Sequence, residues 1–372
     1  MASSSDVVIV GGGIVGIATA YFLGKAGIKS VVVERDSVGS HASGFAYGGL
    51  NPLAGAGVPG PLVAVGFEGM RLHHELSRTL PEQTGVNTEY GVRPTASLCF
   101  TQAEVAGAKM GLPWQQAQEG YTVRWLEPDD VKELDQRISR EALGAVYIEG
   151  TTEVEPYRFV LALAQAAEAL GAEIRHGAVT GLKRQGDRVS GVVLENGEIP
   201  CDRVVLAMGP WSGEASPWLG VPVPVTPLKG QILRLRAPGL PFRCSIGWSG
   251  SYATTKSDGL LWAGTTEEEV GFNETPTTEA RDSIMAELLK MIPSLADAQL
   301  VQQTACLRPL SADGGLVLGP LPGWDGVYAA TGAGRKGILL GPAMGRITAD
   351  LIVKGASDVP IDAFDPGRFS SG

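Results

Sequence analysis

Three glycines near the start of the chain have the spacing of a phosphate-binding turn. Gly11, Gly13 and Gly16 fit the pattern G-x-G-x-x-G. The first glycine permits a tight turn, the second lets the backbone approach a pyrophosphate, and the third lets a helix pack closely on a strand. Ile14 and Val15 begin the predicted helix, whose free amide groups and dipole would attract phosphates. The spacing therefore predicts a dinucleotide site.

An acidic residue lies where the ribose of a dinucleotide would need it. Glu34 ends the next predicted strand after the glycine-rich turn. A carboxylate there can accept hydrogen bonds from both ribose hydroxyls, and it disfavours the 2′-phosphate of NADP. A glycine-rich turn with a chance glutamate is the competing interpretation. The pattern alone does not separate FAD from NAD.

The elements that position these residues form a βαβ unit. Residues 7–10 and 30–33 are β-branched runs typical of buried parallel strands. Between them, Ile14–Lys25 has apolar residues at helical spacing. Similar elements recur after residue 156 and near the C-terminus, whereas 222–306 alternates apolar and polar residues, which indicates antiparallel strands. The sequence therefore predicts an α/β chain (α+β overall) with two interleaved domains.

Composition limits the classes of protein. The 372 residues include 51 glycines, but 44% are hydrophobic and only 19% are charged, which excludes a disordered chain. The net charge of −10 argues against nucleic acid as a partner. The four cysteines and four histidines lack metal-ligand spacing, so we expect no metal, reduced thiols and a cytoplasmic location. Residues 7–24 are apolar but rich in glycine and lack a preceding positive cluster, so we expect no membrane span.

Further motifs give the chain a family resemblance along nearly its whole length. These motifs are residues 6–16, 43–52, 204–212, 229–231, 306–309 and 331–340. With them, the sequence resembles the D-amino-acid oxidase superfamily of FAD-dependent oxidoreductases, nearest to its glycine oxidase and sarcosine oxidase branch. In such families an N-terminal fingerprint whose domain is completed by C-terminal sequence binds FAD.

The resemblance implies a Rossmann-type FAD-binding domain interleaved with a mainly antiparallel β-sheet substrate domain. The FAD-binding domain would comprise residues 1–92, 153–223 and 305–372. The substrate-binding domain would comprise residues 93–152 and 224–304. FAD is expected to bind non-covalently. A covalent link at Cys306 is the alternative, because this residue falls where sarcosine oxidases attach their flavin through a thioether.

The resemblance also implies which residues border FAD. An ordinary flexible loop at 42–50 and a core position for Trp211 are the interpretations that the residues alone would favour. The implied cofactor-binding residues are Gly11, Gly13, Ile14, Val15 and Gly16 in the first turn; Glu34 and Arg35 after the second strand; Ala42, Ser43, Gly48, Gly49 and Leu50 near the flavin and pyrophosphate; Val179, Ala207, Gly209 and Trp211 around the adenosine; and Gly332, Gly334, Arg335, Lys336, Gly337, Ile338 and Leu339 at the flavin's pyrimidine edge.

Three further residues are candidates for substrate contact. Arg308 matches the arginine that binds the substrate carboxylate in glycine oxidase-like enzymes, and its guanidinium suits a bidentate contact. Tyr252 matches a family tyrosine that hydrogen-bonds the substrate. Arg335 matches a second arginine, in the flavin loop. Surface ion pairs for the arginines and a half-buried sheet position for the tyrosine are the competing interpretations.

The resemblance implies oxidation of a small amino acid, with a primary, N-methyl or cyclic amine. Hydride would pass from Cα to flavin N5, and the resulting imine would hydrolyse to an oxo-acid. Oxygen or another acceptor would reoxidise the flavin, and the choice stays open because Trp262 falls near the position of the oxygen-activating lysine of sarcosine oxidases. The alternatives are an FAD-dependent 2-hydroxy-acid dehydrogenase and a flavin-binding subunit of a multi-protein dehydrogenase. A homo-oligomer is compatible with the sequence.

Overall fold

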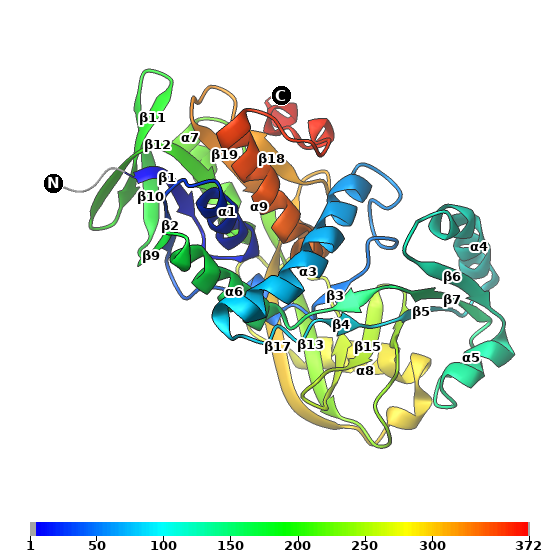
Figure 1. Ribbon diagram of the computed structural model, residues 1–372. Coiled ribbons are helices and arrows are strands. Elements are labelled where there is room, and N and C mark those ends of the chain that lie inside the picture. The colour runs from blue at the N-terminus through cyan, green and yellow to red at the C-terminus, as the bar shows by residue number, and fades with distance from the viewer. Residues whose placement is uncertain (1–4, 371–372) are drawn as a thin grey trace.

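Two large sheets organise the molecule (Figure 1), whose computed structural model describes residues 5–370. The first sheet has eight strands within these residues, and its centre, β9-β2-β1-β12-β19, is parallel. The hairpin β10-β11 and strand β18 pair antiparallel at its edges. The strands are β1 (Ser5–Val10), β2 (Ser30–Glu34), β9 (Glu173–His176), β10 (Val179–Gln185), β11 (Arg188–Leu194), β12 (Gly197–Leu206), β18 (Val317–Pro320) and β19 (Val327–Thr331). This sheet is the predicted Rossmann-type arrangement.

Four helices share the apolar core on one face of this sheet (Figure 1). They are α1 (Ile14–Lys25), α3 (Leu62–Thr84), α6 (Pro156–Ala169) and α9 (Gly337–Lys354). Of these, α1 and α9 contact the strands of the sheet, and α3 and α6 pack against these two helices. Helices α1 and α9 pack closely because Gly345 has no side chain: a Cβ there would lie 2.4 Å from the Cβ of Ala18. This contact joins the two ends of the sequence, and it places the start of α9 beside the start of α1.

The second sheet is almost entirely antiparallel, as predicted, with one parallel pair, β14 and β5. Its order is β17-β13-β16-β15-β14-β5-β7-β6, and α8 (Thr278–Met291) shares its apolar core. The domain boundaries stay a prediction, and β17 runs across one of them. The strands are β5 (Thr95–Cys99), β6 (Thr122–Leu126), β7 (Gly144–Glu149), β13 (Val225–Arg236), β14 (Ser245–Trp248), β15 (Ser251–Thr255), β16 (Leu261–Gly264) and β17 (Gln299–Ser311).

Short elements connect the two sheets. Strands β3, β8 and β4 form a small antiparallel sheet between them. The remaining helices and strands are α2 (Ala42–Phe45), α4 (Gln102–Gln116), α5 (Pro128–Leu134), α7 (Ser216–Leu219), β3 (Gly49–Leu50), β4 (Gly91–Val92) and β8 (Thr152–Glu153).

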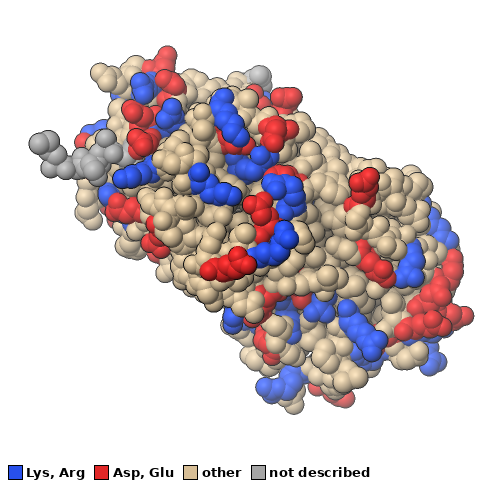
Figure 2. Space-filling view, viewed as in Figure 1, with Lys and Arg blue, Asp and Glu red and all other residues tan. Residues whose placement is uncertain are grey.

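Figure 2 shows Lys and Arg interspersed with Asp and Glu over the viewed face. Within residues 5–370, the helices are too short or too polar to cross a bilayer. The same part of the chain contains no cluster of His, Cys, Asp and Glu that could hold a metal ion. All four cysteines are buried and free.

Candidate active site

The glycine-rich turn after β1 is enclosed by neighbouring backbone. Gly11 has φ +109°, its amide donates to the carbonyl of Val33 at 2.9 Å, and a Cβ there would lie 2.3 Å from the carbonyl oxygen of Ala207. A Cβ on Gly16 would lie 2.0 Å from the carbonyl oxygen of Gly11. Only glycine fits either position, so the turn and the first residues of α1 are fixed at the carboxyl edge of the sheet.

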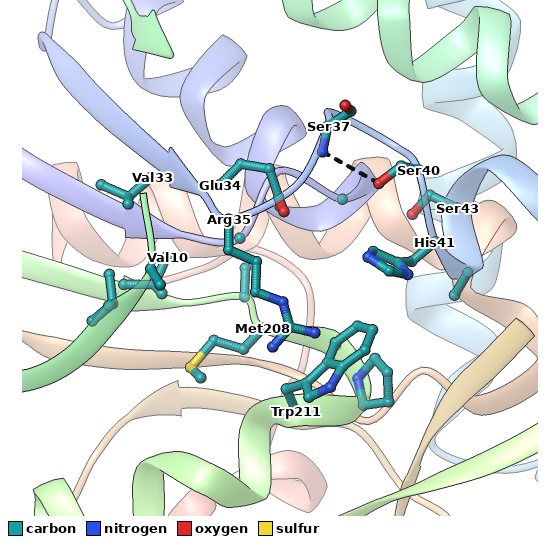
Figure 3. A pocket seen from close by; sticks show the side chains of 18 of the residues that line it. Val10, Val33, Glu34, Arg35, Ser37, Ser40, His41, Ser43, Met208 and Trp211 are labelled. Atoms are coloured by element: carbon teal, nitrogen blue, oxygen red, sulfur yellow. Dashed lines mark hydrogen bonds between the residues drawn. The ribbon is translucent and has the colours of Figure 1, made fainter. Parts of the chain in front are cut away.

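A cavity of about 160 Å³ opens at this edge, beside the end of β2. The carboxylate of Glu34 accepts hydrogen bonds from the backbone amides of Gly12 at 2.6 Å and Asp36 at 2.8 Å. Figure 3 shows the Arg35 guanidinium beside Trp211, and the guanidinium carbon lies 4.1 Å from the indole centroid. The imidazole of His41 also contacts the Trp211 indole, in a T-shaped arrangement. These groups form the adenosine-sized end of the crevice.

A second cavity, of about 240 Å³, continues the first toward the other sheet. The two cavities share the lining residues Gly13, Ala42, Ser43, Ala207 and Gly209, so they form one elongated crevice. The Oγ of Ser43 accepts a hydrogen bond from the amide of Ile14 at 3.0 Å, at the start of α1. The helix N-terminus therefore faces the middle of the crevice, where a pyrophosphate would lie.

Most of the predicted cofactor residues line this crevice. Gly16, Leu50 and Gly332 do not: Gly16 packs under the turn, Leu50 lies in the core with 1% exposed area, and Gly332 faces the carbonyl of Gly315. Gly11, Glu34, Arg35, Val179 and Trp211 line the first cavity, and Ile14, Val15, Gly48, Gly49, Gly334, Arg335, Lys336, Gly337, Ile338 and Leu339 line the second.

The crevice fits a dinucleotide flavin. Gly209 and Gly334 line it with φ of +54° and +50°, and a Cβ on either residue would meet no protein atom within 4 Å. Backbone there is exposed to the open space of the crevice, which suits a flat ligand lying against the chain. The carboxylate at one end, the helix N-terminus in the middle and the cationic loop at the other end match ribose, pyrophosphate and flavin in that order.

Arg308 is largely buried at the far end of the second cavity. Its Nη1 donates to the carbonyl of Thr266 at 3.0 Å, and its Nη2 donates to Oγ1 of Thr265 at 2.6 Å. Burial lowers the pKa of this guanidinium, and no carboxylate among residues 5–370 forms an ion pair with it. A buried cation without a counter-ion is costly, so this group favours an anionic ligand in the cavity.

The strand beside Arg308 makes room for it. A Cβ on Gly230 in β13 would lie 2.0 Å from Nη2 of Arg308. Behind this glycine, Lys229 is 1% exposed and pairs with Glu268, and Oε1 of Glu268 accepts from the Thr266 hydroxyl at 2.5 Å. Burial alone would raise the pKa of Glu268, but these hydrogen bonds hold it below its usual value. The Lys229–Glu268 pair thus fixes the loop that orients the arginine.

Tyr252 in β15 lies beside the strand that leads into this loop, where it pairs with Gly264 of β16. Its hydroxyl is buried and has no hydrogen-bond partner in the described part of the chain. A Cβ on Gly264 would lie 3.1 Å from that hydroxyl, so the glycine leaves space for it. Burial raises the pKa of Tyr252, which keeps the hydroxyl protonated. It is therefore a free donor that a ligand beside Arg308 can use.

The two cations of the flavin loop differ in their surroundings. Arg335 is exposed and pairs with Glu267 at 3.3 Å, and it donates to the carbonyl of Gly250. Lys336 is largely buried and donates to the carbonyl of Ala54, and no ion pair within residues 5–370 involves it. Burial lowers the pKa of Lys336 to about 8. The cavity is therefore electropositive, which suits a carboxylate and a flavin that gains negative charge on reduction.

Cys306 lines the same cavity, two residues before Arg308 on the same face of β17. Burial raises the pKa of its thiol, which disfavours the thiolate. This environment supports the expectation of non-covalent flavin. Trp262, by contrast, lines neither cavity of the crevice.

The sequence did not single out several residues that the structure brings to the site. Tyr47 stacks on Tyr252, Thr265 binds Arg308, and His41 contacts Trp211. Tyr47 belongs to the motif 43–52, which was the available signal. Thr265 lies in a loop without a motif, and only the pairing of β13 with β16 and β17 places it beside the arginine.

The fold and the crevice are those of a dinucleotide-binding protein, with an electropositive pocket at one end of the crevice. Comparison with known proteins agrees: residues 6–351 match the DAO family, described as FAD dependent oxidoreductase. The chain belongs to this family, and FAD is its cofactor.

Individual relatives match along most of the chain. It is 34% identical to a glycine oxidase of Pseudomonas aeruginosa over 354 residues, which covers 94% of this chain and 95% of that protein. The crystal structure of glycine oxidase from Geobacillus kaustophilus superposes with a TM-score of 0.92 at 27% identity, over 98% of each chain. An iminodiacetate oxidase from a Chelativorans strain superposes with a TM-score of 0.89 at 25% identity, over 97% of this chain and 98% of that one.

Proposed function

We propose that this protein oxidises a small amino acid at its Cα–N bond, with a primary, N-methyl or cyclic amine. It is an FAD-dependent amino-acid oxidoreductase that acts on CH–NH2 or CH–NH donors. The observation that carries the proposal is Arg308, a buried guanidinium that lines the second cavity without a carboxylate partner in the described chain. A substrate carboxylate supplies that partner.

The residues of the pocket bind and orient the substrate. Arg308 binds the carboxylate, and the hydroxyl of Tyr252 donates a hydrogen bond to the same group, which limits the rotation of the substrate. FAD held in the crevice would supply the two-electron oxidation of the Cα–N bond. The amine must be neutral for this step and loses its excess proton to water. The product imine takes up water and gives an oxo-acid, with release of ammonia or a free amine from an open-chain substrate and opening of the ring in a cyclic one.

The second cavity favours an amine over an alcohol as the donor. Among the described residues that line it there is no Asp, Glu or His, and Lys336, with a pKa of about 8, is mostly protonated at neutral pH. An amine that has lost its proton to water needs no base in the site, whereas a hydroxyl group must lose its proton as hydride leaves. The oxidation of a 2-hydroxy acid, which would also use Arg308, is therefore the second candidate.

Anaerobic reduction of the flavin separates these candidates. The purified yellow protein is mixed with glycine, sarcosine, the two alanines and the two prolines, and in parallel with glycolate and lactate. We expect an amino acid to bleach the flavin bands and the hydroxy acids to leave them unchanged. Bleaching by hydroxy acids alone would overturn the proposal. Admitting oxygen afterwards, or a dye acceptor, shows which one returns the colour, and turnover by the purified chain alone argues against a subunit role.

A further inference from the structure

A third cavity adjoins the flavin end of the crevice. It has a volume of about 170 Å³, and it is lined by Asn51, Thr95, Ser97, Ser245 and Gly247 on the side away from the flavin. One water molecule needs roughly 10–15 Å³ in such a measure, so the chamber can hold several polar groups. Its hydroxyl and amide lining suits a polar substituent. We call this space the outer chamber.

Two stacked tyrosines form part of the boundary between the outer chamber and the flavin-side cavity, which Gly49, Arg335, Lys336 and Leu339 also line. The rings of Tyr47 and Tyr252 lie 4.3 Å apart between centroids, at an interplanar angle of 26°. Both residues line both spaces. In the proposed function, the hydroxyl of Tyr252 donates a hydrogen bond to the substrate. The ring of Tyr47, stacked on Tyr252, therefore separates the substrate pocket from the outer chamber.

The chain holds Tyr47 firmly in this wall. Its ring lies over Gly49, where a Cβ would be 2.1 Å from the ring carbon Cζ, so only glycine leaves space for it. Its hydroxyl lies 3.4 Å from Oγ of Ser245. The ammonium of Lys256 lies 5.8 Å from the ring centroid and is itself held by Glu153 at 3.1 Å. A ring fixed by these contacts does not swing aside easily.

We propose that Tyr47 is a specificity-determining residue, which limits the Cα substituent of the substrate by closing the active-site cavity off from the outer chamber. This inference rests on the proposed function. It predicts a preference for glycine-sized amino acids, set by one side chain that lies between the predicted flavin-binding residues Ser43 and Gly48. Removing the ring joins the two spaces and opens hydroxyl-lined room for a longer polar side chain.

The test compares Tyr47→Ala with Tyr47→Phe as flavin-loaded proteins. For each, kcat/KM is measured on glycine and on both enantiomers of homoserine and asparagine, and the ratio to glycine is the readout. The ratio cancels any general loss caused by a less ordered Tyr252. We expect the ratio to rise at least tenfold in Tyr47→Ala and to keep its wild-type value in Tyr47→Phe, which retains the ring. The visible spectrum of bound flavin confirms that each variant is folded.

A second substitution tests whether the higher kcat/KM ratio of Tyr47→Ala comes from the space of the outer chamber. Ser97 lies on the wall of the outer chamber, and Leu at this position fills part of the space. Tyr47→Ala combined with Ser97→Leu should return the ratio to the wild-type value. If Tyr47→Ala changes kcat/KM equally for all substrates, the ring is no specificity determinant and the inference is overturned. A wild-type protein whose flavin no amino acid reduces would overturn the proposed function as well, and the two failures are thereby distinguishable.

Discussion

The two ends of the crevice are built in different ways. The adenosine end combines the backbone of one glycine turn, at Gly11 and Gly13, with side chains that follow soon after it in the chain, such as Glu34 and Arg35. The substrate end is made of buried side chains from distant segments, such as Arg308 in β17 and Tyr252 in β15. The first end needs a shape that one βαβ unit provides. The second end needs charged groups that have no partner of opposite charge within the protein, so that the ligand becomes the partner.

This difference predicts that the two ends can be damaged separately. A change in the turn should release FAD and destabilise the fold. A change around the arginine should leave FAD bound and weaken only the binding of substrate.

The largest effect is expected for Gly16→Ala. The new Cβ would lie 2.0 Å from the carbonyl oxygen of Gly11, and both atoms belong to fixed backbone. We expect a loss of more than about 3 kcal/mol in the free energy of unfolding, because neither segment can move aside. The measurement is thermal unfolding together with FAD content. Gly107→Ala in α4, where a Cβ meets nothing within 4 Å, is the matched control and should keep full FAD.

Gly230→Ala should affect only the substrate end. Its Cβ would lie 2.0 Å from Nη2 of Arg308, so the guanidinium must shift from its place beside Thr265. We expect KM for the best amino acid to rise about tenfold or more, with FAD content unchanged, since a misplaced charge-assisted contact costs about 1.5–3 kcal/mol. Gly181→Ala in β10, whose Cβ would have 3.9 Å of space, is the control. Loss of FAD from Gly230→Ala would show that the two ends are not separate.

Glu34→Gln should weaken FAD binding without changing the substrate's KM. The amide cannot replace the carboxylate as an acceptor for two ribose hydroxyls, and it also weakens the bond from the Gly12 amide. A decrease in FAD affinity of about tenfold is expected, measured by titrating the apoprotein with FAD and following protein fluorescence. Glu198→Gln, an exposed residue of β12, is the control. An unchanged affinity for FAD would show that Glu34 does not bind the ribose.

The smallest expected effect is a pH dependence from Lys336. Burial lowers its pKa to about 8, so the ammonium loses its proton as pH rises through that value. The cavity then loses a positive charge, and the affinity for a carboxylate inhibitor such as acetate should fall a few-fold above about pH 8. Lys336→Met should bind acetate more weakly below this pH and show no such step. The step, if retained in the variant, would belong to another group.

The titration of Lys336 should also affect the stability of the protein, which should rise with pH where the affinity for a carboxylate falls. Because the pKa of Lys336 is lower in the folded chain than in the unfolded one, its burial costs stability below about pH 8. This cost decreases as pH rises from there toward the unfolded value of 10.5.

The same contrast explains what the sequence could predict. Helix α1 has the predicted bounds, Ile14–Lys25, because the glycine turn and the apolar spacing are local signals. The antiparallel strands of the second sheet within residues 222–306 also followed from local alternation, whereas β5, β6 and β7 did not. Arg308 was found through a family motif and not through any pattern of its own.

The features that sequence reasoning missed depend on contacts between distant segments. Thr265 reaches Arg308 only because β13 pairs with β16 on one side and β17 on the other. The ring of Tyr47 can lie between the two cavities only because Gly49 leaves space for it and because Tyr252 of β15 stacks on it. The lack of an ion-pair partner for Arg308 likewise depends on the fold, because it requires that no carboxylate from a distant segment packs beside the guanidinium.

The most direct test is the dependence of anaerobic flavin reduction on substrate concentration in Arg308→Leu, compared with the wild type. The central claim is that this buried guanidinium binds the substrate carboxylate while the crevice holds FAD independently of it. We therefore predict that the half-saturating amino-acid concentration rises at least about a hundredfold, as expected for loss of a buried charge contact. The flavin content and spectrum should stay those of the wild type. An unchanged half-saturation, or a colourless protein, would contradict the account.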